Sequence, residues 1–324
     1  MKKTVVSIGE ILWDVFPQGK RLGGAPANFA WNMAQLGYRA RLLTAVGRDE
    51  LGREILQRLA PSGLDADVQQ TDYPTGSVQV ETDAAGVPTY RFRADVAWDH
   101  LRFTEAEAAM AASADCVCYG TLASRSTETA RSLEAFLQVV ARRKTACRVF
   151  DVNLRQDFYS RELIERLLGL SDVVKVNEEE LEVLAGMWLP GAGDREEKCR
   201  ELLARFGLRL VVLTCGGQGS LVVCSDGEIS RKSSPVIEIA DTVGAGDAFT
   251  AGFCAGLLGG KRLERCHELG VELASFVCTR PGAMQQIPQA LREKFFRFSE
   301  LPSERRRVMH VISGRIPTRA GKKW

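Results

Sequence analysis

The sequence lacks any long hydrophobic run. No stretch of its 324 residues approaches the ~20 consecutive apolar residues that span a bilayer. The first sixteen residues, MKKTVVSIGEILWDVF, carry two lysines, but Glu10 and Asp14 interrupt their apolar residues. They therefore predict a first β-strand rather than a signal peptide. We expect a cytoplasmic protein without a membrane partner.

Cysteine and histidine are present, but not in the spacings that bind zinc. The nine cysteines include no C-x-x-C pair, and the three histidines form no cluster. Most cysteines lie in apolar runs, and their number is odd. This usage is typical of buried thiols in a reducing compartment, so neither a disulfide framework nor a zinc site is expected.

Two nucleotide-binding fingerprints are also missing. The sequence has no G-x-x-x-x-G-K-[ST], which excludes a P-loop NTPase, and no G-x-G-x-x-G after the first strand, which disfavours a dinucleotide oxidoreductase. Internal repeats and long linkers are absent as well. A content of 45% apolar and 26% charged residues excludes collagen, a coiled coil and a wholly disordered chain.

The few unbalanced charges lie at the C-terminal end. Residues 302–324 carry a net charge of +6, whereas the whole chain carries +2, so the remainder is mildly acidic at −4. This tail has no clear hydrophobic period, and we expect it to be mobile rather than a nucleic-acid-binding element. Residues 1–301 are expected to form a single domain.

Short β-branched runs alternate with stretches of helical period along most of the chain. This order predicts βαβ units, hence an α/β fold with a doubly wound, mostly parallel sheet flanked by helices. The expected strands are 5–8, 42–46, 116–119, 149–152, 173–176, 210–213, 221–224 and a strand-like run at 236–240. The expected helices are 27–36, 51–59, 127–142, 161–168, 178–184, 196–206, 247–258, 263–279 and 289–299.

One segment breaks this alternation. Residues 77–82 and 89–93 alternate apolar and polar side chains around a turn, which predicts a β-hairpin with one apolar face. A hairpin alone is marginal in water, so it needs a partner surface. We expect residues of about 10–22 and 75–100 to form a small β lid over the C-terminal edge of the main sheet, where such folds bind ligands. Its apolar face could also pair with a second copy of the chain.

The strongest chemical signal is Asp241-Thr-Val-Gly-Ala-Gly-Asp-Ala-Phe249. Gly244 and Gly246 let the backbone turn sharply, and with Ala245 they place bare N–H groups at the start of a predicted helix. Such a helix end favours an anion such as a phosphoryl group. We expect Asp247, at the same helix end, to be ionised at pH 7 and able to accept a hydroxyl proton.

A second motif suits a polyhydroxylated ligand. Gly23-Gly-Ala-Pro-Ala-Asn28 offers close backbone approach at Gly24 and both a donor and an acceptor at Asn28. Asp14 follows the first strand, and its carboxylate can accept hydrogen bonds from two hydroxyl groups. Together with the glycine motif at 241–249 and with Gly47-Arg-Asp-Glu-Leu-Gly52, this segment resembles the PfkB (ribokinase-like) carbohydrate kinases. The resemblance runs from about residue 4 to 299 and is nearest to bacterial fructokinases.

The resemblance implies further roles. Asn177 and Glu180 match the N-x-x-E motif that helps to hold Mg²⁺ through water, although alone they indicate a helix N-cap. ATP would lie along Thr214, Gly216, Gly217 and Gly219 and against Gly282. A monovalent cation such as K⁺ would be held by Asp241, Val243, Val277 and Gly282, but Gln286 stands where a Ser often completes that site. Val271 replaces an Asn commonly near the adenine.

Several substrate contacts are also implied. Asn153 and Arg155 belong to a D-x-N-x-R segment that faces the cleft in this family, with a salt bridge as the alternative for the arginine. Arg91 on the hairpin could contact a sugar, a carboxylate or a second phosphate. Trp98 could stack on a sugar face or simply pack between lid and body.

The resulting hypothesis is an ATP- and Mg²⁺-dependent sugar kinase that phosphorylates a primary hydroxyl, most plausibly of fructose. Alternatives within the fold are kinases for 2-keto-3-deoxygluconate, ribose, another sugar, a phosphosugar or a nucleoside. A non-catalytic sugar-binding regulator is a weaker alternative, because Asp247 and both glycines of its motif are present.

Overall fold

The computed structural model describes residues 2–60, 63–82, 88–191 and 193–296. Its main sheet has nine strands in the order β13-β12-β11-β10-β9-β8-β1-β4-β5. The strands from β5 to β11 in this order are parallel to one another, and β12 pairs antiparallel with both β11 and β13. Their bounds are β1 Thr4–Ile8, β4 Arg39–Gly47, β5 Asp65–Thr71, β8 Cys116–Gly120, β9 Cys147–Asp151, β10 Val173–Asn177, β11 Leu210–Thr214, β12 Ser220–Cys224 and β13 Ile229–Lys232.

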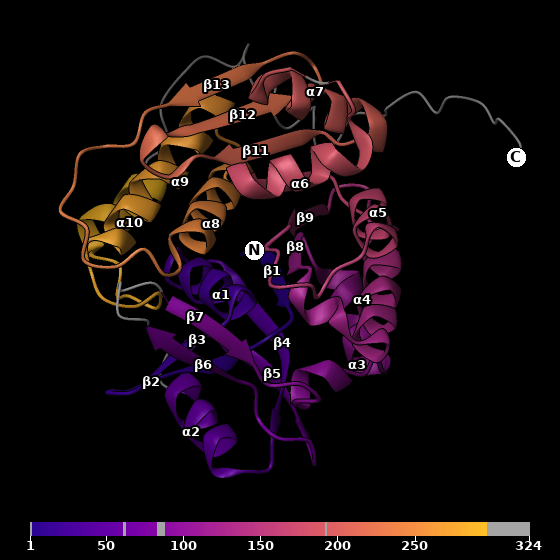
Figure 1. Ribbon diagram of the computed structural model, residues 1–324, viewed down its shortest axis with the longest axis vertical. Coiled ribbons are helices and arrows are strands. Elements are labelled where there is room, and N and C mark those ends of the chain that lie inside the picture. The colour runs from indigo at the N-terminus through magenta and orange to yellow at the C-terminus, as the bar shows by residue number, and fades with distance from the viewer. Residues whose placement is uncertain (1, 61–62, 83–87, 192, 297–324) are drawn as a thin grey trace, which may run out of the picture.

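Helices cover both faces of this sheet (Figure 1). One buried cluster packs α1, α8 and α9 on one face, and a second packs α3 to α7 on the other. The alternation of strands and helices therefore gives the predicted doubly wound α/β fold. The helices are α1 Ala25–Gln35, α2 Glu50–Leu59, α3 Glu105–Ser113, α4 Thr127–Val140, α5 Arg161–Gly169, α6 Glu178–Trp188, α7 Arg195–Phe206, α8 Ala245–Leu258, α9 Leu263–Cys278 and α10 Gln289–Phe296.

The predicted hairpin forms part of a second, four-stranded sheet in the order β3-β2-β6-β7. Strands β6 (Ser77–Thr82) and β7 (Pro88–Phe92) are the hairpin, and β2 (Leu12–Phe16) and β3 (Gly19–Gly23) come from the N-terminal segment. Leu12, Val78 and Val80 pack together on one face of it. The lid is narrower than expected, since residues 97–100 leave it to form the buried 3-10 helix η2.

The loop after β9 holds the lid to the body of the protein. Gln156 donates a hydrogen bond from Nε2 to the carbonyl oxygen of Tyr90 at 2.7 Å, and the rings of Phe92 and Phe158 meet edge to face at 5.9 Å. These contacts fix the lid over the carboxyl ends of the parallel strands, the edge at which an open α/β sheet binds its ligands.

Some expectations about local structure were wrong. Residues 236–240 form no strand, because they run beyond the edge strand β13 with no strand to pair with, and Val236 and Ile239 are exposed. Sequence reasoning missed β5, β13 and α3. The thiols behave as predicted: eight of the nine cysteines are buried and all are free. Residues 297–299 of the last predicted helix, and the basic tail, lie outside the described residues.

Two negative findings apply to the described part of the chain. None of its helices is both long and apolar enough to span a membrane. Nor does it contain a group of three or more His, Cys, Asp or Glu side chains that could hold a metal ion.

Candidate active site

The glycine motif has the predicted geometry at the start of α8. Gly244 is the N-cap residue, with a φ of +77°, and a Cβ atom there would lie 2.3 Å from Cβ of Ala283. Only glycine fits this conformation and this contact. The helix begins at Ala245, whose N–H group donates to the carbonyl oxygen of Thr242 at 3.2 Å, while the N–H groups of Gly246 and Asp247 have no partner within the helix. Such a helix end favours an anion, and we call it the anion site.

Asp247 lies in the first turn of α8 and contacts the second motif directly. The side-chain Nδ2 of Asn28, on α1, donates to Oδ2 of Asp247 at 2.8 Å, across 219 residues of sequence. Burial and the nearby carboxylate of Asp151 raise the pKa of Asp247 to about 6, while Asn28, Lys175 and Arg155 act in the opposite direction. The raised pKa still leaves the group mainly ionised at pH 7, the state that the sequence predicts.

A buried ion pair lies beneath the anion site. Lys175, in the middle of β10, places Nζ 3.0 Å from Oδ1 of Asp151, and Thr250 donates to Oδ2 of the same carboxylate at 3.0 Å. A Cβ atom on Gly246 would lie 3.1 Å from this Nζ, so the ammonium group packs against the glycine backbone. Burial lowers the pKa of Lys175, but Asp151, Glu180 and Asp247 outweigh it and raise the pKa.

Asn177 and Glu180 form a capping box at the start of α6. Oδ1 of Asn177 accepts the Glu180 N–H at 2.8 Å, and Oε2 of Glu180 accepts the Asn177 N–H at 2.8 Å. Oε1 of Glu180 accepts the N–H of Leu154 at 3.0 Å, which ties α6 to the loop after β9. Both carboxylate oxygens of Glu180 thus already accept a backbone N–H, although each keeps a further lone pair. A contact to a metal ion through a water molecule therefore fits better than direct ligation.

Asp14 lies on β2 and is half-buried, with the charged groups of Arg155, Arg21 and Asp241 near its carboxyl group. Burial raises its pKa to about 6, and the guanidinium groups of Arg155 and Arg21 oppose that shift. Gly24 follows β3 with a φ of +111°, and a Cβ there would lie 2.5 Å from the carbonyl oxygen of Glu10. The structure therefore brings Asp14, Gly24 and Arg155 to the same edge as Asp247.

Of the remaining predicted substrate residues, Asn153 lies at the carboxyl end of a central strand, whereas Arg91 lies on the lid. Asn153 follows β9, is buried and has a φ of +44°, a conformation uncommon outside glycine. Arg91 pairs with Gln79 in the lid, one residue from Phe92. Because neighbouring strand residues point to opposite faces, and Asp14 and Phe92 are both paired with Val78, Arg91 lies on the face away from Asp14.

Trp98 does not present an open face to the cleft. Its side chain is 1% exposed and packs with Val96, Leu122 and Ala123. The Arg125 guanidinium lies 4.0 Å from the ring centroid. The structure thus supports packing between lid and body, the alternative reading of this residue, rather than stacking on a sugar.

The predicted nucleotide loop joins β11 to β12. Thr214 ends β11, and Gly216 and Gly219 have φ values of +50° and +105°. A Cβ on Gly219 would lie 2.2 Å from the Lys232 carbonyl oxygen, whereas one on Gly216 or Gly217 would meet nothing within 4 Å. The loop therefore packs tightly on one side and leaves open space on the other.

The predicted monovalent-cation residues also make other contacts. Asp241 accepts the N–H groups of Val243 at 3.0 Å and Gly282 at 2.9 Å, and its Oδ2 lies 3.2 Å from Nη1 of Arg21. The carbonyl oxygen of Val277 accepts the N–H of Arg280. These contacts involve the side chain of Asp241 and one lone pair of the Val277 carbonyl oxygen, whereas the expected cation ligands are mainly backbone carbonyl oxygens, so the cation site stays a prediction.

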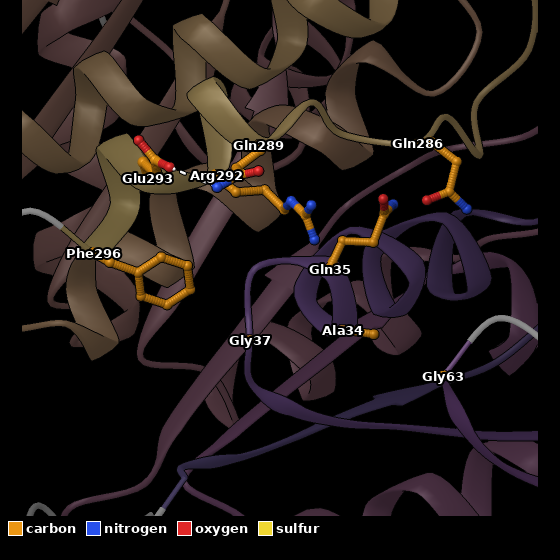
Figure 2. Close-up of a pocket in the computed structure, with 9 residues that line it drawn as sticks. All are labelled: Ala34, Gln35, Gly37, Gly63, Gln286, Gln289, Arg292, Glu293 and Phe296. Carbon is orange, nitrogen blue, oxygen red and sulfur yellow. Dashed lines mark hydrogen bonds between the residues drawn. The ribbon is translucent and has the colours of Figure 1, made fainter.

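Gln286 lies apart from these residues. It lines a cavity of about 570 Å³ between α1 and α10, together with Gln35 and Arg292 (Figure 2). The neighbouring Gln285 is held to α1, since Trp31 and Gln35 both donate to its carbonyl oxygen. Gln286 therefore does not complete the predicted cation site.

Sequence reasoning missed three charged residues of the site, Glu10, Asp151 and Lys175, all of which are buried. Lys175 interrupts the apolar run Val173–Val176, and Glu10 interrupts the apolar N-terminal run. A charge inside an otherwise buried strand needs a partner or a function, and that was the available signal.

Comparison with known proteins decides the family. The model of the "pfkB family carbohydrate kinase" matches residues 7–290. The chain belongs to this family. As a family member it is a phosphotransferase of the carbohydrate kinase type, with the ribokinase-like fold of its structural neighbours.

Three relatives illustrate the range within this pfkB family. A fructokinase of Klebsiella pneumoniae is 31% identical over 300 residues, covering 87% of this chain and 95% of its own. An ATP-dependent 6-phosphofructokinase of Thermoanaerobacterium thermosaccharolyticum is 29% identical over 311 residues, covering 89% and 91%. A fructokinase variant of Vibrio cholerae, solved with fructose, ADP and potassium, has a TM-score of 0.75 at 26% identity, covering 91% and 98%.

Proposed function

We propose that this pfkB-family kinase is an ATP-dependent fructokinase that phosphorylates a primary hydroxyl group of the free sugar. The observation that carries the proposal is the Asn28–Asp247 hydrogen bond, which joins the polyol motif to the candidate base at the anion site. A sugar hydroxyl bound near Asn28 would therefore lie next to both the base and the phosphoryl-binding amides.

The geometry supports direct transfer. The hydroxyl oxygen forms a bond to the γ-phosphorus of ATP, the bond from that phosphorus to the β–γ bridging oxygen breaks, and ADP leaves. Asp247 accepts the hydroxyl proton, for which it is ionised at neutral pH. The N–H groups that follow Gly244 hold the charge that develops on the transferring group. The lid excludes water.

ATP and Mg²⁺ are the cofactors of this proposal. The open side of the loop at Gly216 and Gly217 would take the nucleotide, and Asn177 and Glu180 would hold Mg²⁺ through water. Bound Mg²⁺ neutralises phosphate charge. K⁺ is a further candidate, for which the backbone carbonyl oxygens of Asp241, Val243, Val277 and Gly282 would be the main ligands.

Charge around the cleft favours a neutral sugar over a phosphosugar. The carboxyl groups of Asp14, Asp241 and Asp247 outnumber the guanidinium groups of Arg21 and Arg155, and Arg21 is paired with Asp241. Two hairpin arginines, Arg91 and Arg93, are the candidates for a second phosphate. Arg91 lies on the far face of the lid, and Arg93, just after β7, lies near the carboxyl group of Asp49. A second phosphate would therefore enter an acidic site with a single unpaired guanidinium, that of Arg155, among these groups.

A coupled ADP-release assay tests the proposal. Fructose, ribose, 2-keto-3-deoxygluconate, adenosine and fructose 6-phosphate are supplied with ATP and Mg²⁺, and the Asp247→Ala variant serves as the blank. We expect turnover with fructose that is lost in the blank. Turnover with another substrate would overturn the choice of fructose but keep the mechanism, and silence with all five would count against the fructokinase assignment.

Two other expectations stay predictions. Pairing of two lids in a homodimer would use the apolar face of the small sheet, on which Tyr90 is paired with Val80 and is 42% exposed. The cytoplasmic location is the second.

A further inference from the structure

Glu10 is a buried carboxyl group that the mechanism above does not use. It lies between β1 and β2, at the carboxyl end of β1, and is 2% exposed. Its Oε2 atom has no hydrogen-bond partner among the described residues. A buried carboxylate oxygen without a partner is costly, so the position calls for an explanation beyond packing.

The surroundings of Glu10 place it behind the catalytic contact. Gly24, the N-cap residue of α1, has no side chain to cap the helix, and its backbone packs against the carbonyl oxygen of Glu10. The N–H of Ala25, the first residue of α1, lies near enough to the Glu10 carboxyl group to lower its pKa. Glu10 therefore adjoins the first turn of the helix that carries Asn28.

Two charged side chains face this carboxyl group from the other elements around it. Asp247 approaches from α8 and Arg155 from the loop after β9. The first turn of α1 has no acidic residue, and Gly9 packs against the apolar atoms of Pro26 and Ala123. Glu10, which is buried, and Asp247, which is half-buried, thus form a pair of carboxyl groups with one nearby guanidinium.

We propose that Glu10 is a positioning residue for Asp247, a buried carboxyl group behind it that keeps its proton when Asp247 is ionised. The inference rests on the proposed kinase function. In this state the pair carries one negative charge, on the group that must accept the hydroxyl proton. The protonated Glu10 keeps the region behind Asn28 and Asp247 neutral, next to the anion site that takes the transferring phosphoryl group of ATP.

The order of ionisation supports this assignment. Asp247 is only half-buried, accepts a hydrogen bond from Asn28 and lies at a helix N-terminus, whereas Glu10 is 2% exposed and its Oε2 atom has no donor among the described residues. Burial, with a smaller contribution from the charge of Asp247, raises the pKa of Glu10 to about 7 against the opposing effects of backbone N–H groups and Arg155. The pKa of Asp247 itself is raised only to about 6. Coupled carboxyl groups lose their protons in two steps that belong to the pair. The first step produces the active form, and the second adds a charge that opposes ATP.

The pH dependence of kcat/KM for ATP, with sugar saturating, measures this second step. Above pH ~7 the wild-type value should fall by up to about tenfold per pH unit. This alkaline limb of the pH profile reports the ionisation of Glu10 in the enzyme before ATP binds. In Glu10→Gln the amide stays neutral, so this limb should disappear up to pH ~9. The alkaline limb in kcat should lie at higher pH than that in kcat/KM, since the phosphates of bound ATP favour the protonated form of Glu10.

Glu107→Gln is the matched control. Glu107 is 4% exposed on α3, where it completes a capping box with Thr104. Its replacement should reduce stability but leave the wild-type pH profile unchanged. A Glu10→Gln profile that keeps the wild-type alkaline limb, while Glu107→Gln also keeps it, would overturn the role of Glu10.

Two further measurements separate the possible failures. If Glu10→Gln does not fold, carboxyl-carbon NMR of the wild-type protein at pH 5–9 should show a buried carboxyl group that titrates above Asp247, with Asp247→Asn assigning the partner. Absence of such a group would refute the proposal. Full activity of Asp247→Asn would instead refute the proposed function itself.

Discussion

Replacement of Lys175 by Met tests the buried ion pair beneath the anion site. Lys175 is 8% exposed and Asp151 is 6% exposed, with 3.0 Å between Nζ and Oδ1. Methionine keeps the length of the side chain but leaves the Asp151 carboxylate buried without its cation. Removing one partner of a buried pair costs about 3–5 kcal/mol. We expect the free energy of unfolding to fall by about this amount in urea titrations at pH 7.

The sign of the pH dependence follows from the raised pKa of Lys175. The folded protein holds the proton more tightly than the unfolded chain, whose lysine has an ordinary pKa of 10.5. The stabilisation is therefore fully present below pH 10.5 and is lost only as the pH rises beyond it. The cost of Lys175→Met should therefore not fall anywhere between pH 6 and 9, and it should grow with pH as Asp247, whose pKa Lys175 lowers, loses its proton.

Two companion variants make the test specific. Lys198→Met removes the surface partner of Glu182 and should cost no more than about 1 kcal/mol. Adding Asp151→Asn to Lys175→Met removes the uncompensated charge and should recover part of the stability without recovering activity. A cost for Lys175→Met as small as that for Lys198→Met would refute the reasoning.

Two further predictions concern the anion site. Gly244→Ala should abolish most turnover, because the new Cβ would lie 2.3 Å from that of Ala283 at a φ of +77°. ADP-release assays check this, with Gly186→Ala on α6 as the control, since a Cβ there meets nothing within 4 Å. Turnover at half the wild-type rate or more would count against it. Activity should also fall below pH ~6 by up to about tenfold per unit as Asp247 takes up its proton, measured as kcat/KM for the sugar. Lys175→Met should move this limb to higher pH, since Lys175 lowers the pKa of Asp247; an unmoved limb would show that another group titrates.

The fold was largely predictable because its parallel strands are buried runs of β-branched residues. Strands such as Val173–Asn177 and Leu210–Thr214 leave little doubt about their type, and the helices between them have clear caps. Strand β5, with the sequence DADVQQT, is half-buried at the edge of the sheet and lacks such a run. Its formation depends on pairing with β4, which local sequence does not reveal.

The site was predictable where backbone geometry demands glycine or a cap. The motifs at Gly244 and Asn177 fall at helix starts, as their patterns indicate. Contacts between distant segments were not predictable in the same way. The packing of Trp98 under Arg125 depends on how the lid and body meet, and the pKa of Asp247 depends on burial that only the folded chain creates.

The role of Asp247 as the base is the central claim, and Asp247→Asn tests it most directly. The amide keeps the size of the side chain but cannot accept the hydroxyl proton. We expect kcat in the fructose assay to fall by about 10²–10⁴-fold, the usual contribution of a general base, while calorimetry shows sugar affinity within a few-fold of wild type. Asp194→Asn, at the N-cap of α7, is the control and should keep wild-type kcat. An Asp247→Asn enzyme that retains most of its activity would contradict the account.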